Sequence, residues 1–227
     1  MKIIFEMKSW SELKYTKQRI VSHKKIAEGA YILSFSRNFD FKAGQVVGLG
    51  INKEIAPRLY SIASAEKADM VDILYAEKSG GELSPALPLF REGDEILVSE
   101  PFGTFTQYSD DAVYVAAGTG IAPFMSRILS EKGNSPTLIH GVSYPEYFYY
   151  SDFLTEKLGR NYIQCCSRCA EDDYFQGRVT TFLTHWQNLD TTKKYYLCGS
   201  AEMVVDTRDV LISRGVPFAN INAEIYF

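Results

Sequence analysis

The segment VYVAAGTGIAP, residues 113–123, decides the fold of the second half of the chain. Its first five residues are apolar, which is typical of a parallel strand buried on both faces of a sheet. The glycines at positions 118 and 120 let the backbone turn sharply, and Pro123 suits the first turn of a helix. The segment therefore predicts a strand, a glycine turn and a helix N-terminus whose N–H groups can hold a phosphate. A purely structural turn is the alternative, and the spacing is not the G-x-G-x-x-G of the ordinary dinucleotide fingerprint.

The residues that follow continue an alternation of strands and helices. The pattern predicts helices over 122–132, 147–158, 180–186 and 201–214, and strands over 137–141, 162–167, 195–198 and 220–226. Strands that alternate with helices in this way predict a doubly wound α/β domain around a parallel sheet.

The first hundred residues have a different rhythm, with short strands separated by turn residues. The predicted strands are 19–26, 31–37, 45–51, 59–63, 71–77 and 94–100, with one short helix over 84–89. Six short strands at this spacing predict an N-terminal antiparallel β-barrel. We therefore expect two domains, 1–107 and 108–227, with the boundary inside 105–111.

Composition limits the class of protein. The chain has 227 residues, of which 46% are hydrophobic, so it can bury the cores of two modest domains. No apolar stretch approaches the ~20 residues that span a bilayer. Residues 1–13 mix charged and apolar side chains, unlike a signal peptide, so we expect a cytoplasmic protein with no membrane or nucleic-acid partner. We also expect a monomer.

The charge is unevenly distributed along the chain. Residues 1–58 carry a net charge of +6, whereas residues 59–227 carry −10. A basic front half can steer an acidic partner towards the protein, although chance asymmetry explains the numbers equally well.

The cysteines raise the question of a metal site. Cys165, Cys166 and Cys169 lie close together, and Cys198 is distant from them. A zinc or iron–sulfur site needs four ligands at workable spacing, and the three scattered histidines form no ligand pattern. We therefore expect no metal and interpret the cysteines as reduced structural thiols.

Two segments of the predicted barrel suit a nucleotide. On a strand, Arg58 and Tyr60 share one face, so a cation for phosphate and a ring for stacking lie together, with the Ser61 hydroxyl nearby. The glycines at positions 80 and 81 form a turn that opens a short helix, again fit for a phosphate. Taken singly, an ordinary amphipathic strand and a plain turn explain these segments better.

The order of the motifs is more specific than any one of them. From Gln18 to Phe227 it resembles the ferredoxin–NADP(H) reductase family, and the short bacterial branch most of all. The matching pieces are FKAGQ (41–45), RLYS (58–61), GELS (81–84), PFGTF (101–105), GTGIAP (118–123), CGSAEM (198–203) and AEIYF (223–227).

The resemblance implies an FAD site in the barrel. Arg58 would hold the FAD pyrophosphate, Tyr60 would pack on the isoalloxazine, and Ser61 would hydrogen-bond near N5. The implied FAD contacts further include Leu59, Tyr75, Gly81, Glu82, Leu83 and Ser84.

The resemblance also implies a nicotinamide dinucleotide site in the second domain. Thr119 and Gly120 would cradle the pyrophosphate, and Cys198 and Glu224 would line the nicotinamide pocket. Tyr226 would cover the second flavin face, and Phe227 would extend towards the adenine of FAD. The implied catalytic set is Ser61, Cys198, Glu224 and Tyr226. A core role for Cys198 and a solvated position for Glu224 are the structural alternatives.

Ser167, Arg168 and Arg178 resemble the residues that grip the 2′-phosphate of NADP in bacterial members. Guanidinium groups match a phosphate and discriminate against NAD. Ser143 stands where several members carry another Arg, which weakens this expectation and keeps NAD(H) as the second possibility. Surface ion pairs of the two arginines with Glu171, Asp172 or Asp173 are the structural alternative.

The implied activity is hydride transfer between NADP(H) and FAD, with single electrons passed to or from a separate ferredoxin or flavodoxin. Three alternatives remain: a reductase of free flavin, an electron-transfer subunit of a larger complex, and a non-catalytic nucleotide-sensing module.

Overall fold

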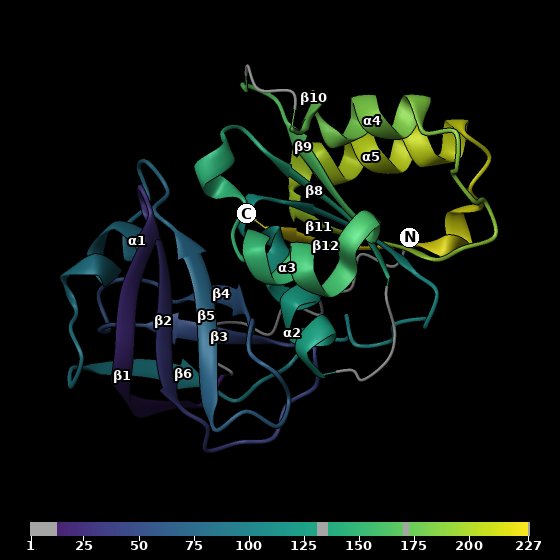
Figure 1. Cartoon of the computed structure of the whole chain (residues 1–227). Helices are drawn as coiled ribbons and strands as arrows, with labels where there is room; N and C mark the ends of the chain where they lie inside the picture. Colours follow the sequence, from purple (N-terminus) through teal and green to yellow (C-terminus); the bar gives the residue numbers. More distant parts are fainter. Residues whose placement is uncertain (1–12, 131–135, 170–172, 227) are drawn as a thin grey trace. The chain divides into compact units, whose positions relative to one another are not determined.

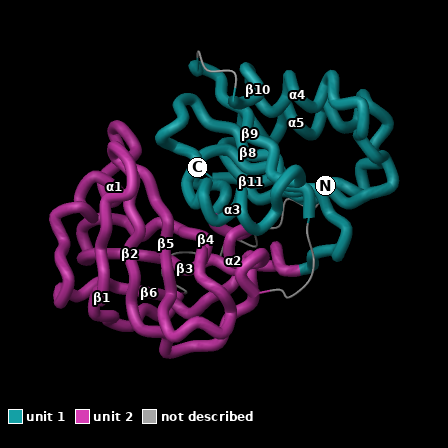
Figure 2. The backbone as a smooth tube through the Cα atoms, viewed as in Figure 1, with its two compact units in different colours: residues 1–4, 107–121, 133–227 teal, residues 5–106, 122–132 magenta. Residues whose placement is uncertain are grey.

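The computed structural model describes residues 13–130, 136–169 and 173–226. The described chain divides into two compact units (Figure 2). One, the barrel unit, comprises 13–106 and 122–130, and the other, the α/β unit, comprises 107–121, 136–169 and 173–226. The expected assignment of 1–107 to FAD and 108–227 to NADP(H) stays a prediction, and the contacts of 122–130 group that helix with the barrel unit.

The barrel unit is built on one antiparallel sheet. Its strands are β1 (Tyr15–Ala27), β2 (Ala30–Ser36), β3 (Val46–Gly50), β4 (Arg58–Ser61), β5 (Met70–Ala76) and β6 (Glu95–Ser99). They pair in the order β4-β3-β6-β1-β2-β5 (Figure 1). The two edge strands meet through an antiparallel bridge between Ile62 and Ile73, so the sheet closes on itself and the predicted barrel is confirmed.

Inward-facing apolar side chains fill the barrel. Leu33, Phe35, Val47 and Leu49 are fully buried in this core. Short helices α1 (Leu83–Ala86) and η2 (Leu87–Leu89) occupy the place of the predicted helix 84–89. Helix α2 (Ala122–Ser130) adds a ring contact between Phe105 and Phe124, whose centroids are 6.0 Å apart.

The α/β unit is built on one parallel sheet. Its strands are β7 (Val113–Ala117), β8 (Thr137–Val142), β9 (Tyr162–Cys166), β10 (Phe175–Gln176), β11 (Tyr195–Ser200) and β12 (Ile221–Tyr226). Their order, β10-β9-β8-β7-β11-β12, confirms the predicted doubly wound sheet and places its switch point between β7 and β11. Helices α4 (Val179–His185) and α5 (Ala201–Ser213) pack together on one face, and α3 (Ser151–Leu158) lies on the other (Figure 1).

One predicted helix is broken in the structure. Instead of a helix over 147–158, the chain forms a 3₁₀ turn, η4 (Pro145–Tyr147), and then α3. Tyr150, the residue before α3, has a φ of +61°. A left-handed residue cannot continue a right-handed helix, so the helix begins only at Ser151. Among the described helices, none is long and apolar enough to cross a membrane.

The glycine turn after β7 is held by close backbone packing. Residues Gly118–Ile121 form a 3₁₀ turn, η3, and Gly118 has a φ of +52°. A Cβ on Gly120 would collide with the carbonyl oxygen of Cys198, and it would lie 2.9 Å from the nitrogen of Gly199. Both obstacles are backbone atoms of β11, so neither can move aside cheaply. The glycine at 120 is therefore required by packing, independently of any ligand.

We expect Gly120→Ala to lower the free energy of unfolding by about 1–3 kcal/mol, the usual range for overpacking a tight contact. The matched control is Gly50→Ala, because a Cβ there meets only side-chain atoms, the nearest being the Pro57 ring at 3.3 Å. Chemical denaturation of both variants checks the prediction. Equal losses of unfolding free energy in the two variants would show that the contact with β11 does not require a glycine at position 120.

Candidate functional site

Strand β4 places the first group of predicted site residues in the barrel unit. Arg58 is exposed, and its Nη1 donates to the carbonyls of Ala56 and Pro57, each at 3.0 Å. Tyr60 is half-buried, and burial raises the pKa of its hydroxyl to about 12. Ser61 is buried at the end of the strand. The exposed guanidinium and the half-buried ring lie on the same face of β4, as the alternation of the strand predicts.

Tyr75, a buried residue of β5, packs against the ring of Tyr60. The two rings meet edge to face at 6.1 Å, and the Tyr75 hydroxyl lies 2.7 Å from Nε2 of His23. Nδ1 of His23 lies 3.0 Å from the carbonyl of Phe90. Since a carbonyl only accepts, Nδ1 carries the proton and Nε2 accepts from Tyr75. Tyr75 is 1% exposed, so it contacts the ring of Tyr60 from within the core, and its implied contact with FAD stays a prediction.

The predicted turn at 80–84 is tight and internally bonded. Gly80 has a φ of +73°, and the Gly81 nitrogen donates to the carbonyl of Lys78 at 2.9 Å. Ser84 is buried, and its Oγ accepts from the nitrogen of Lys78 at 3.0 Å. Leu83 is buried and Glu82 is exposed, so of this motif Glu82 reaches solvent most freely.

In the α/β unit, several predicted residues lie at the carboxyl edge of the parallel sheet. Thr119 and Gly120 follow β7, Ser167 and Arg168 follow β9, and Glu224 lies near the end of β12. Carboxyl ends of parallel strands share one edge, which is where doubly wound sheets bind ligands. The topology therefore brings these residues to one edge of this unit.

A buried histidine holds the glycine turn in place. His140 is fully buried, its Nε2 lies 3.3 Å from the carbonyl of Gly118, and its Nδ1 lies 3.1 Å from the hydroxyl of Tyr162. The carbonyl can only accept, so Nε2–H donates to Gly118 and Nδ1 accepts from Tyr162. Burial lowers the pKa of His140 to about 4, so the ring is neutral near pH 7. Sequence reasoning missed this role because histidine spacing reports ligand patterns, not partners on other strands.

Cys198 and Glu224 form a buried pair on adjacent strands. They are register partners of β11 and β12, and Cys198 Sγ lies 3.9 Å from Glu224 Oε2. Cys198 is 0% exposed and Glu224 is 5% exposed. Burial, followed by the charge of Glu224, raises the pKa of the Cys198 thiol well above its usual value, and a hydrogen bond with Tyr226 opposes this in part. The sulfur is thus a thiol that donates to Glu224, not a nucleophilic thiolate.

This pair excludes one of the two structural alternatives, and the full burial of Cys198 agrees with a core role as well as with a place in the pocket. Glu224 is buried beside a thiol, so its interpretation as a solvated surface charge is wrong. Tyr226 is half-buried at the end of β12. Phe227 lies outside the described residues.

Arg168 contacts an aromatic residue that follows β8. Its guanidinium carbon lies 5.7 Å from the centroid of the Tyr144 ring, and its Nη1 donates to the Tyr144 hydroxyl at 3.4 Å. The backbone nitrogen of Ser167 donates a hydrogen bond to the carbonyl of Val142 at 3.0 Å, which holds this residue against β8. Both Ser167 and Arg168 are exposed.

Arg178 is paired with an acidic residue at the start of α5. Its Nη1 lies 3.0 Å from Glu202 Oε1, and both side chains are well exposed. The Gly177 nitrogen donates to the carbonyl of Cys166 at 2.9 Å, so the backbone before Arg178 lies beside the backbone before Ser167. An exposed ion pair contributes about 0–1 kcal/mol, so an anionic ligand can displace it at low cost.

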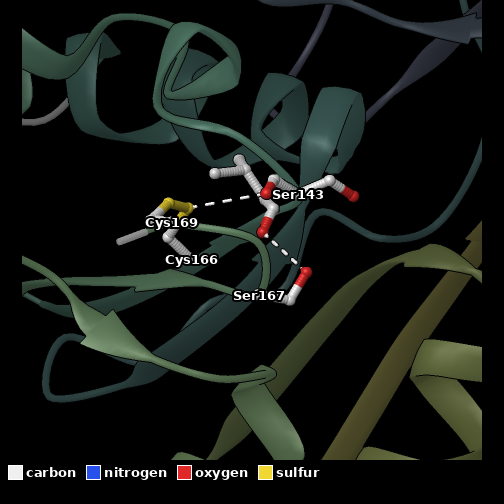
Figure 3. Close-up of a disulfide and its surroundings, with 5 residues drawn as sticks. Ser143, Cys166, Ser167 and Cys169 are labelled. Carbon is white, nitrogen blue, oxygen red and sulfur yellow. Dashed lines mark hydrogen bonds between the residues drawn. A yellow bond between two sulfur atoms is a disulfide. The ribbon is translucent and has the colours of Figure 1, made fainter. Parts of the chain in front are cut away.

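The cysteines differ from the expectation of reduced thiols. Cys166 and Cys169 are joined by a disulfide, with Cα atoms 5.6 Å apart (Figure 3). Cys165 and Cys198 are free and buried. The expectation was wrong for this pair because Cys166 ends β9 and the chain turns back within three residues, which brings the two sulfurs of the Cys-x-x-Cys spacing together.

Comparison with known proteins finds oxidoreductases that use a nicotinamide dinucleotide domain or act as reductases. Residues 114–209 match the model of the oxidoreductase NAD-binding domain. The chain is 31% identical over 159 residues to the ferredoxin–NADP reductase of Pseudomonas aeruginosa, covering 64% of this chain and 57% of that protein. It is 30% identical over 186 residues to the propane 2-monooxygenase reductase component of Mycolicibacterium smegmatis, covering 73% of this chain and 53% of that protein. The chain thus spans little more than half the length of these two relatives.

The fold is shared over a whole solved structure. A ferredoxin NADP+ reductase from Neisseria gonorrhoeae, solved with bound FAD and NADP, matches with a TM-score of 0.84 at 26% identity. The match covers 95% of this chain and all of that one.

His140 makes stability depend on pH with a defined sign. Its pKa is about 4 in the folded state and near 6.5 in the unfolded chain. Between pH 4 and pH 6.5 the unfolded state binds more protons than the folded state. The contribution of His140 to the free energy of unfolding is therefore fully present above pH 6.5 and is lost as the pH falls towards 4. We expect a loss on the order of 2 kcal/mol between pH 7 and pH 5 that is absent in His140→Gln.

Denaturant unfolding at the two pH values measures this difference. The matched control is His185→Gln, because His185 lies exposed at the end of α4 and its replacement should leave the wild-type pH dependence. An identical pH dependence in wild type and His140→Gln would contradict the neutral buried imidazole.

Proposed function

We propose that the chain, as a member of the ferredoxin–NADP(H) reductase family of oxidoreductases, binds FAD and transfers hydride between NADP(H) and the flavin. Single electrons then pass to or from a separate carrier such as a ferredoxin or a flavodoxin. We propose a cytoplasmic monomer in which residues 1–107 hold FAD and residues 108–227 hold NADP(H).

The observation that carries the proposal is the buried Cys198–Glu224 pair beside the glycine turn. Gly120 packs directly on the carbonyl of Cys198, and Glu224 lies on the neighbouring strand. The thiol and the turn therefore meet at the switch point of the sheet, with the carboxyl group one strand further along, and a dinucleotide binds at the switch point in this topology. A protein that only packed its core would have little reason to bury a carboxylate there.

The residues of the barrel fit an FAD molecule. Arg58 offers an exposed guanidinium, Tyr60 offers a half-buried ring braced by Tyr75, and the turn at Gly80 and Gly81 lets the backbone approach a phosphate. Ser61 supplies a buried hydroxyl at the end of β4. When bound, FAD supplies the chemistry of hydride and single-electron exchange.

The residues of the protein itself would align the nicotinamide ring with the flavin and set the charge around it. Cys198 stays protonated and fully buried, so it supports the nicotinamide pocket by packing beneath it and does not attack the ring. Glu224 places a carboxyl group at the edge where charge develops on that ring. Tyr226 adds an aromatic ring at the end of β12. Thr119 and Gly120 offer the backbone of η3 to the pyrophosphate.

The partner has two candidates. The net charge of +6 over residues 1–58 favours an acidic carrier such as ferredoxin or flavodoxin. The relative from Mycolicibacterium smegmatis is named as the reductase component of a monooxygenase, which favours an oxygenase as the second candidate. Reduction of each purified carrier by the chain and NADPH distinguishes them.

The first test is the purified protein itself. We expect a yellow protein with one FAD per chain whose flavin is bleached by NADPH. In Cys198→Ala and Glu224→Gln we expect FAD to be retained but flavin reduction to slow by about tenfold or more, because only alignment and charge are lost. Stopped-flow absorbance measures the rate. A colourless protein that oxidises NADPH only with added flavin would support the free-flavin reductase instead.

The second test concerns the choice between NADPH and NADH. A 2′-phosphate carries about −1.5 to −2 charges, and each charge-assisted hydrogen bond contributes about 1.5–3 kcal/mol. Arg168→Ala or Arg178→Ala should therefore lower kcat/KM for NADPH by about ten- to a hundredfold and leave NADH nearly unchanged.

Arg160→Ala is the matched control. Arg160 is also exposed, but it precedes β9 and so lies towards the opposite edge of the sheet. Its replacement should leave both nucleotides unaffected. Parallel losses for NADPH and NADH in the Arg168 and Arg178 variants would refute the 2′-phosphate role and leave the flavoenzyme assignment intact.

A further inference from the structure

The disulfide encloses two of the residues proposed to select the nucleotide. Cys166 and Cys169 are bonded, as Figure 3 shows, and the residues between them in the sequence are Ser167 and Arg168. From this juxtaposition we propose that Cys166 and Cys169 form a redox-active pair that sets the affinity of the site for a 2′-phosphate. The inference rests on the proposed function, because Ser167 and Arg168 are the groups it would control.

One end of the four-residue loop is anchored in the sheet. Cys166 is the last residue of β9 and is 1% exposed. The Gly177 nitrogen donates to its carbonyl at 2.9 Å, and the Ser167 nitrogen donates to Val142 at 3.0 Å. Cys169 belongs to no helix or strand, so the disulfide is what ties this end of the loop back to β9.

The bridge restricts the freedom of the two enclosed residues. Ser167 and Arg168 are both exposed, and Arg168 rests on Tyr144 through one contact with the ring and one with the hydroxyl. Closing a loop around exposed side chains lowers the entropy that a ligand must remove on binding. The disulfide form is therefore the form with the higher affinity for a 2′-phosphate.

The surroundings of Cys166 suit the reduced state as well. Its Sγ lies 3.6 Å from the carbonyl oxygen of Ser143 (Figure 3). A disulfide sulfur has no proton to donate, whereas a Cys166 thiol can donate to this carbonyl. Val142 and Phe148 pack beside Cys166 in a small apolar cluster. Both redox states thus have a place for the sulfur without moving β9.

Burial defines which sulfur reacts. Cys169 is half-buried, whereas Cys166 is buried. The thiolate of a dithiol reductant therefore attacks the Sγ atom of Cys169. The Cys166–Cys169 bond breaks, and Cys166 leaves as a thiolate that takes a proton. The second thiol of the reductant then resolves the mixed disulfide, releasing the Cys169 thiol and leaving the reductant as a disulfide. Two electrons and two protons are transferred, and oxidation by a small disulfide such as oxidised glutathione reverses the sequence.

The pattern of the sequence agrees with this chemistry. Cys-x-x-Cys beside a strand of a parallel sheet is typical of thiol–disulfide exchange. In cytosolic proteins, disulfides are usually transient or redox-sensing and not permanent staples. Cys165, which lies next to Cys166, is free and buried in the main core of the unit, so it is not part of the pair.

The experiment compares the holoprotein after reduction by dithiothreitol and after oxidation by oxidised glutathione, with each reagent removed. Alkylation and peptide mass mapping report the state of Cys166 and Cys169. Calorimetry measures binding of adenosine 2′,5′-bisphosphate and of ADP, which lacks the 2′-phosphate. We expect the oxidised form to bind the 2′,5′-bisphosphate about three- to tenfold more tightly, with ADP binding equal in both states.

Two variants complete the test. Cys166→Ser/Cys169→Ser should bind the 2′,5′-bisphosphate as the reduced wild type does, whichever reagent is used. Cys165→Ala should respond to redox state as the wild type does. Free thiols at both positions after oxidation, or equal 2′,5′-bisphosphate affinity in the two states, would overturn the inference.

The failure of the proposed function has a different signature. A protein that binds ADP and the 2′,5′-bisphosphate equally in both states has no 2′-phosphate preference to regulate, and this outcome overturns the NADP assignment and the redox control together. A preference that is present but indifferent to redox state overturns the redox control alone.

Discussion

The contact between Gly120 and the backbone of Cys198 is the constraint on which the α/β unit depends. It joins the turn after β7 to the end of β11, the two strands that flank the switch point. Only a residue without a Cβ allows this approach, so the turn cannot drift away from the sheet. The same contact fixes where Cys198 lies relative to the turn, and the pairing of β11 with β12 then fixes Glu224.

Much of the fold was predictable from the sequence because its signals are local. The apolar run of β7 spans the predicted residues, and the switch from short alternating strands to strand–helix alternation separates the two sheets correctly. The failures also have physical causes. Strand β10 has two residues, too few for a period to appear, and the left-handed Tyr150 breaks a pattern that reads as one continuous helix.

The candidate site was predictable only in part, because its motifs name residues but not their partners. The positions of Thr119, Gly120 and Glu224 follow from strand order. The partners of His140 lie on β9 and in the turn after β7, and the disulfide depends on how the chain turns after β9. The contacts of His140 arise from tertiary packing between distant segments, so no spacing in the sequence contains them, whereas the disulfide joins residues three apart and depends on the local turn after β9.

The α/β unit separates two tasks by burial. Its buried polar groups, the neutral His140 and the protonated Cys198, hold geometry without adding positive charge at the edge of the sheet. The positive charge lies instead on Arg168 and Arg178, which are exposed on loops. Changes in those loops therefore alter which anion is favoured while the buried alignment persists. In the proposed function, a redox-active pair at Cys166 and Cys169 acts on the loop that carries Arg168, so it would change nucleotide preference and leave the alignment of the proposed nicotinamide pocket intact.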